Sequence, residues 1–165
     1  FNMTLADRYR RWFEFEQDAH ARVLTSLDTV SLENRDEQAF LESVELYAHM
    51  MSARLFWLYR FGVTELGPKG LFPKRVSLDE LEDMAADTHA TWADYLDRLD
   101  QEELDRIFEY KSEDGEVYSN SVEDILTQLF HHSAYHRGQI ASRLKSIGGT
   151  PEPTDLVFWA RDQVG

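Results

Sequence analysis

The sequence predicts an all-α protein, built as a four-helix bundle with one small β-hairpin before the last helix. Three observations favour this fold class. Apolar residues recur at intervals of three and four along four long segments, which is the period of an amphipathic helix. Glycine and proline gather between these segments. Only the stretch around Asp114-Gly115 has short apolar and aromatic runs on both sides of a turn signal, as a hairpin does.

The first two helices are predicted over residues 5–27 and 36–61, with a polar break at 31–34 between them and Gly62 at the end of the second. The second helix carries apolar side chains on two opposite sides. We therefore expect one side in the core and the other at a pocket wall or a partner subunit. The core stripe is Phe40, Val44, Tyr47, Met51, Leu55 and Leu58, and the opposite stripe is Leu46, His49, Ala53 and Phe56.

A loop rich in Gly and Pro is predicted over residues 62–76, before the third helix. Ser77 and Glu80 have the spacing of a capping box, so we expect this helix to begin at Ser77 and to end near Leu99.

The hairpin is predicted between Arg106 and Asn120, with Asp114-Gly115 as a two-residue turn. Ser121 then caps the last helix, which ends before Gly148-Gly149. The apolar tail, residues 154–162, is expected to pack over one end of the bundle.

The composition excludes several classes of protein. With 31 acidic and 17 basic residues among 165, the net charge is −14, the wrong sign for a nucleic-acid partner. The absence of cysteine excludes disulfides, thiolate metal sites and a cysteine nucleophile. We expect a single domain over residues 3–165, no membrane span and a cytoplasmic location, and we interpret Phe1-Asn2 as additions ahead of the native sequence.

His132 and His136 lie four residues apart in the last predicted helix, so both imidazoles project from the same, largely aliphatic face. A buried imidazole needs partners for both nitrogens, and a divalent cation would supply one; the alternative is a pair of structural core histidines. His49 lies at the middle of its helix, level with the pair if the two helices are neighbours. His89 and His20 are also near the middle of their helices, so the residues alone leave the third ligand open.

The segment His132-Ser-Ala-Tyr-His136-Arg-Gly-Gln-Ile140, continued by Gly148-Gly149-Thr-Pro151 and Asp155, resembles the last helix of the DinB family of bacterial four-helix-bundle metalloproteins. His49, followed by Phe56-Trp57, is similar to the family's second-helix ligand. The resemblance implies an up-down-down-up bundle, frequently a homodimer, with a divalent metal ion held by His49, His132 and His136. Zinc and nickel are the metals we expect. The resemblance leaves packing or surface roles to His20, His89 and His131.

Three imidazoles leave a coordination position open, which distinguishes a chemical site from a closed structural one. A metal in such a site can activate water for hydrolysis or bind a thiol as thiolate. The resemblance implies both hydrolases and transferases that use a low-molecular-weight thiol such as bacillithiol or mycothiol. We expect a thiol S-transferase acting on a small-molecule substrate; the alternatives are a metal-dependent hydrolase and a non-enzymatic, metal-stabilised dimer.

Pocket residues are predicted around the three histidines. They are Ala53, Arg54, Gln139 and Arg143, with Arg60 as a further cation for an anionic thiol. Glu42 and Glu45 are the candidates for the general base of a hydrolase, although exposed acids on a bundle helix are more often solvated. Arg137 is expected to make a capping or subunit contact.

Overall fold

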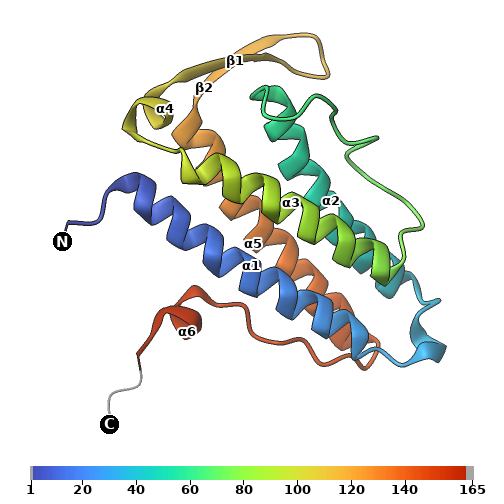
Figure 1. Cartoon of the computed structure of the whole chain (residues 1–165). Helices are drawn as coiled ribbons and strands as arrows, with labels where there is room; N and C mark the ends of the chain where they lie inside the picture. The colour runs from blue at the N-terminus through green and yellow to red at the C-terminus, as the bar shows by residue number, and fades with distance from the viewer. Residues whose placement is uncertain (1, 163–165) are drawn as a thin grey trace.

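The computed structural model of the chain describes residues 2–162, and its main body is a bundle of four long helices (Figure 1). These are α1 (Leu5–Asp28), α2 (Gln38–Arg60), α3 (Leu78–Asp97) and α5 (Val122–Ser146). The shorter elements are the 3-10 helix η1 (Leu32–Asn34), α4 (Gln101–Asp105), β1 (Ile107–Lys111), β2 (Val117–Ser121) and α6 (Leu156–Ala160).

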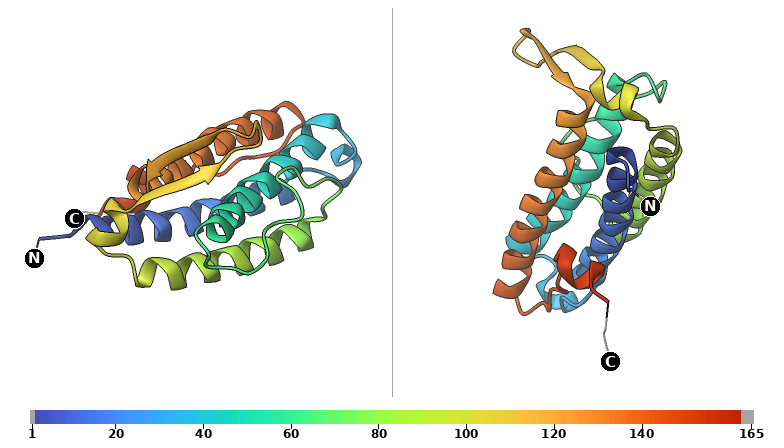
Figure 2. Two further views of the ribbon diagram at one scale, coloured as in Figure 1. Left: turned by 90° about the horizontal axis from the view of Figure 1, so that it is seen from above. Right: turned by 90° about the vertical axis from the view of Figure 1, so that its left-hand side faces the viewer.

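The long helices run up, down, down and up in chain order, because the link between α2 and α3 returns along the length of the bundle (Figure 1). Each of α1 and α2 packs against both α3 and α5. The neighbours α2 and α5 run in opposite directions (Figure 1). The antiparallel hairpin and α4 lie together at one end (Figure 2). The predicted fold class, an all-α bundle with a hairpin before its last helix, is therefore confirmed.

Local capping signals explain where the long helices begin and end. Ser77 and Glu80 form the predicted capping box of α3, and the Ser121 hydroxyl accepts a hydrogen bond from the Asp124 amide at the start of α5. Gly62 and Gly148 follow the ends of α2 and α5 with φ of 76° and 82°, a left-handed conformation that glycine adopts without a Cβ penalty.

The core has two apolar layers with a polar layer between them. One apolar layer is built around Leu27, Met51 and Leu144, and the other around Trp92, Leu104 and Leu126. On each long helix, buried polar residues interrupt the apolar stripe between these two clusters. They include Glu16, His20, His49, Arg54, Thr88, Ser133 and Arg137.

Buried ion pairs and a histidine pair hold the polar layer together. The Glu16 carboxylate on α1 contacts the Arg54 guanidinium of α2 and accepts a hydrogen bond of 2.7 Å from Nη1 of Arg137 on α5. His20 and His89 stack in the same layer, with Nδ1 of His20 lying 3.0 Å from Nε2 of His89. The expected capping or subunit contact of Arg137 is therefore wrong: its side chain is 5% exposed and crosses to α1.

Three local predictions need correction. The hairpin turn has three residues, because the Gly115 amide donates to the Ser112 carbonyl and Gly115 then adopts φ of 89°, a type I turn followed by a bulge. The short helix α4 between α3 and the hairpin was not predicted. The C-terminal tail runs back beside α1 instead of covering an end of the bundle, with Trp159 packed 5.9 Å from the Phe15 ring (Figure 1).

Within residues 2–162, none of the helices combines the length and the apolar character that crossing a membrane requires.

Acidification should destabilise the bundle through His20 and His89. Burial lowers the pKa of His20 well below 6.5 and that of His89 to about 4. The unfolded chain therefore binds protons at a higher pH than the folded chain does. The contribution of the two neutral histidines to the free energy of unfolding is fully present above pH 6.5. It should fall as the pH drops from 6.5 toward 4, by about 1 kcal/mol per pH unit for each histidine.

Urea unfolding at several pH values, in the presence of a chelator, measures this dependence. The double variant His20→Gln, His89→Gln should show a shallower pH dependence than the parent. An equal pH dependence of the free energy of unfolding in the parent and the double variant would show that the two histidines do not cause the loss of stability in acid.

Candidate metal centre

Three histidines come together between α2 and α5. His49 lies on α2, and His132 and His136 lie one turn apart on α5. Nε2 of His132 is 3.1 Å from Nε2 of His49 and 3.1 Å from Nε2 of His136. In the described part of the chain this is the one group of three or more His, Asp or Glu residues with donor atoms within 4.8 Å of one another.

Helix geometry explains the convergence. The spacing of four residues stacks His132 over His136 on one face of α5. α2 and α5 have similar lengths and pack as antiparallel neighbours, so the middle of α2, where His49 lies, meets the middle of α5. The structure thus brings together the three residues that the family resemblance implies as ligands, and places His20 and His89 elsewhere.

Hydrogen bonds orient two of the rings. Nδ1 of His49 lies 2.6 Å from the carbonyl oxygen of Leu71, and Nδ1 of His136 lies 2.7 Å from Oε1 of Gln139. Both oxygens can only accept, so each Nδ1 carries the proton and donates it. The lone pair of each Nε2 then points toward the centre of the cluster.

This arrangement fits a divalent cation. A neutral His132 ring carries one proton, so it can donate to at most one of the two Nε2 lone pairs that face it. A divalent cation would accept a lone pair from each of the three rings. Two nitrogens bound to one tetrahedral zinc ion at 2.0–2.1 Å lie about 3.3 Å apart, close to the observed spacing of 3.1 Å. Partners on Nδ1, such as Leu71 and Gln139, are the usual support of metal-binding imidazoles.

Burial favours the neutral form of two of the ligands, His49 and His132. It lowers the pKa of His132 to about 4, helped by the positive charges of His136, His49 and Arg54 when these are protonated. Burial also lowers the pKa of His49. At neutral pH these two rings therefore present lone pairs without first losing a proton.

A hollow of about 500 Å³ opens beside His49. Its wall is formed by α2 residues Ala53, Phe56, Trp57 and Arg60, by Leu71 of the loop, and by residues 112–114 of the hairpin turn. Phe72, the next residue of the loop, stacks on the His49 ring with centroids 4.2 Å apart. Sequence reasoning missed the roles of Leu71 and Phe72; the available signal was that Phe72 is the one aromatic residue of the predicted loop, residues 62–76.

The four predicted pocket residues have different positions. Ala53 lines the hollow, whereas Gln139 hydrogen-bonds to His136. Arg143 forms an ion pair with Glu42 at 2.9 Å, the surface pairing that such a residue most often makes. Arg54 requires a correction: it is 2% exposed, contacts Glu16 and donates to the Ser133 hydroxyl at 3.1 Å, so it belongs to the core.

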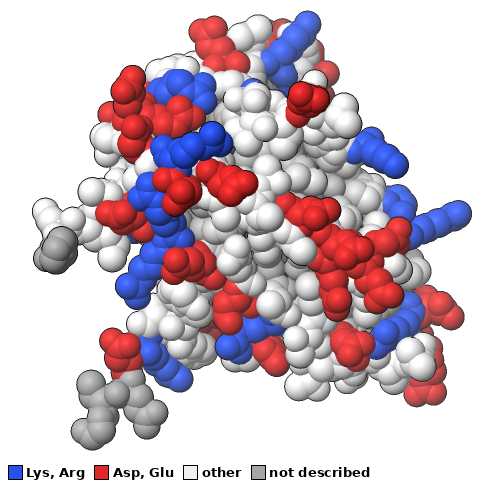
Figure 3. All heavy atoms as spheres, in the orientation of Figure 1, with Lys and Arg blue, Asp and Glu red and all other residues white. Residues whose placement is uncertain are grey.

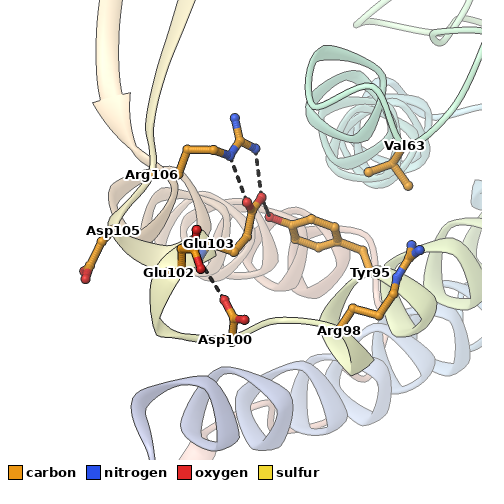
Figure 4. Close-up of a pocket in the computed structure, with 8 residues that line it drawn as sticks. All are labelled: Val63, Tyr95, Arg98, Asp100, Glu102, Glu103, Asp105 and Arg106. Atoms are coloured by element: carbon orange, nitrogen blue, oxygen red, sulfur yellow. Dashed lines mark hydrogen bonds and ion pairs between the residues drawn. The ribbon is translucent and has the colours of Figure 1, made fainter.

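A larger hollow of about 920 Å³ lies near α4, away from the histidines (Figure 4). Its central groups bind one another: the Tyr95 hydroxyl donates to Glu103 at 2.8 Å, and Arg106 donates twice to the same carboxylate. This cluster fastens α4 to the end of α3. Acidic side chains also gather over the first half of α3 on the face shown in Figure 3, consistent with a solvated helix face.

The sequence model of the DinB family matches residues 2–163, essentially the whole chain, so the chain belongs to the DinB family. No curated protein and no solved structure shows a significant match to the chain.

Replacement of His132 by Ala should abolish tight binding of zinc or nickel, because His132 is the one ring whose Nε2 lies 3.1 Å from both other Nε2 atoms. Elemental analysis after dialysis should give close to one ion per parent chain and almost none for the variant. His131→Ala is the matched control, since the exposed His131 lies next to the site and faces away from it. Equal metal content in H132A and H131A would overturn the ligand assignment.

Replacement of Gln139 by Ala should weaken metal binding about 10- to 100-fold, because His136 loses the acceptor that fixes its tautomer and ring orientation. Competition with a chromogenic chelator measures this change. Gln139→Glu, which restores an acceptor oxygen, should recover most of the affinity. An unchanged affinity in Q139A would show that the hydrogen bond does not support the ligand.

Proposed function

We propose that this DinB-family protein is a metal-dependent enzyme that uses a low-molecular-weight thiol to modify a small electrophilic molecule. The observation that carries the proposal is that His49 of the three-nitrogen cluster lines a hollow whose wall also contains Arg60 and the aromatic rings of Phe56 and Trp57. A divalent ion with an open coordination position lowers the pKa of a bound thiol or water. The chain's own residues would hold the ion, bind the thiol and limit access of water.

Arg60 is suited to bind an anionic thiol. Its guanidinium lies over the rings of Phe56, Trp57 and Tyr110, with centroid distances of 4.1, 4.8 and 4.8 Å. Nη2 donates to the Lys111 carbonyl at 3.1 Å. Among residues 2–162 no carboxylate comes within 4 Å of this guanidinium, although Glu113 of the same hollow acts on it from a longer distance. The guanidinium therefore keeps donors that a ligand can reach.

The surroundings of the histidines favour thiol transfer over hydrolysis. A hydrolase would be helped by a general base beside the reacting water. Glu45 forms an ion pair with Lys74 at 2.5 Å, and Glu42 accepts hydrogen bonds from Arg143 and Gln38. Both candidate bases are thus engaged elsewhere, and in the described residues no carboxylate joins the histidine cluster.

Phe72 is placed to control entry. The ring stacks on His49 while 65% of its surface remains exposed, so it can be displaced without opening the core. In its present position the Phe72 ring covers one face of the His49 imidazole and leaves less room for water to reach it.

Other properties stay predictions from the sequence. They are the choice between zinc and nickel, the small-molecule substrate, the homodimer and the cytoplasmic location. The non-enzymatic alternative, a metal-stabilised dimer, would be favoured if the metal-loaded protein showed no turnover with any thiol.

Conjugation of monochlorobimane tests the proposal. The metal-loaded protein should form the fluorescent conjugate faster than the uncatalysed rate only when bacillithiol, mycothiol or another small thiol is supplied. Arg60→Gln should raise the KM for an anionic thiol about tenfold with little change in kcat, because one charge-assisted contact is lost.

Arg98→Gln, an exposed change at the residue that follows α3, is the control and should leave both constants unchanged. Metal-dependent cleavage of an ester without any thiol would favour the hydrolase. Equal KM values in the parent and R60Q would remove Arg60 from the thiol site.

A further inference from the structure

A second cavity lies on the other side of α5, between α1, α5 and the C-terminal tail. Its volume is about 530 Å³, within the range of small-molecule sites. His131 lines it, facing away from the metal ligands on the same helix. The metal centre and this cavity are therefore separate sites on opposite faces of α5.

Aromatic rings form one wall of this cavity. Trp12 and Phe130 meet edge to face with centroids 5.7 Å apart, and Tyr9 packs against both. The Tyr9 hydroxyl is hydrogen-bonded to Thr127 at 2.6 Å, which fixes the ring. The accessible parts of Trp12 and Phe130 offer apolar surface to an aromatic ring.

The floor of the cavity carries a buried guanidinium. Glu16 and Arg137 line it, and both are at least 95% buried. Glu16 is shared between Arg137 and Arg54, so two guanidiniums face one carboxylate at this depth, and the charge of Asp155 in the tail also acts on Arg137. Burial lowers the pKa of Arg54 to about 9 and that of Arg137 to about 10, so both remain charged at neutral pH.

Arg137 retains donors for a ligand. Its Nη1 binds Glu16, whereas Nε has no acceptor among residues 2–162, and no described residue accepts from Nη2. A buried N–H donor without an acceptor is costly, and a carboxylate that reached this guanidinium would remove that cost. Within the described residues no carboxylate other than that of Glu16 lies within 4 Å of Arg137, and Asp155 of the tail acts on it from a longer distance.

The rim limits the kind of anion. Glu123 and Asp155 line the cavity, and the chain as a whole has a charge of −14. A dianion such as phosphate carries two negative charges, and Glu123 and Asp155 would repel both of them. A monocarboxylate needs one partner and can place its apolar body against the aromatic wall.

We propose that this cavity binds a small aromatic monocarboxylate, with its carboxylate on Arg137 and its ring against Trp12 and Phe130. The site is independent of the metal centre and of the proposed thiol transfer.

Phenylacetate is a suitable probe, and its binding can be followed by chemical-shift changes in the metal-loaded, full-length protein. Saturable shifts should include Trp12 and Ala134. Phenylacetamide, which has the same shape without the charge, should bind at least tenfold more weakly. Phosphate should not compete. The variant His132→Ala should bind phenylacetate as the parent does, which excludes binding through the metal.

Ala134→Phe keeps the proposal testable without disturbing the buried ion pairs, because Ala134 lines the cavity at an exposed position of α5. It should fill the cavity and weaken phenylacetate binding at least tenfold, whereas Ser142→Phe, at an exposed position of α5 outside this cavity's lining, should not. Lack of saturation by 10 mM phenylacetate, equal binding of the amide, or unchanged binding in A134F would overturn the proposal. Sedimentation showing that A134F instead dissociates a dimer would reassign this surface to a subunit interface.

Discussion

The convergence of three imidazole lone pairs between two antiparallel helices is the constraint on which the rest of the structure depends. His49, His132 and His136 present their Nε2 atoms to one point, an arrangement that is unfavourable unless a cation lies among them. The carbonyl of Leu71 and the amide of Gln139 hold two of the rings in the required tautomer. The α2–α3 loop therefore contributes to the site as well as connecting two helices that run in the same direction.

The buried ion pairs fix the heights at which the helices meet. Glu16 on α1 contacts Arg54 on α2 and Arg137 on α5, in the same polar layer as the histidines. If α5 slid along α1, the pair with Arg137 would break and leave buried charge unpaired, at a cost of about 3–5 kcal/mol. Apolar layers alone would tolerate such a slide more easily, because their contacts are not directional. The polar layer thus helps to keep the metal ligands level.

Much of the fold and the metal-ligand set could be predicted from the sequence. Helical periodicity gave the four long helices, and the spacing of His132 and His136 gave half of the site. Matching helix midpoints placed His49 at the right height, but only the family resemblance selected it over His20 and His89. Arg54 and Arg137 were misplaced because arginine is usually exposed, and nothing local in the sequence identifies Glu16 as their shared partner. The contacts of Leu71 and Phe72 depend on the path of a long loop, which tertiary packing determines.

X-ray absorption at the metal edge tests the central claim most directly. The account predicts one metal ion with three imidazole nitrogens at about 2.0–2.1 Å for zinc, and room for a further light-atom ligand. A spectrum with an oxygen-only shell, or with one imidazole or none, would contradict the convergence of the three histidines on one ion.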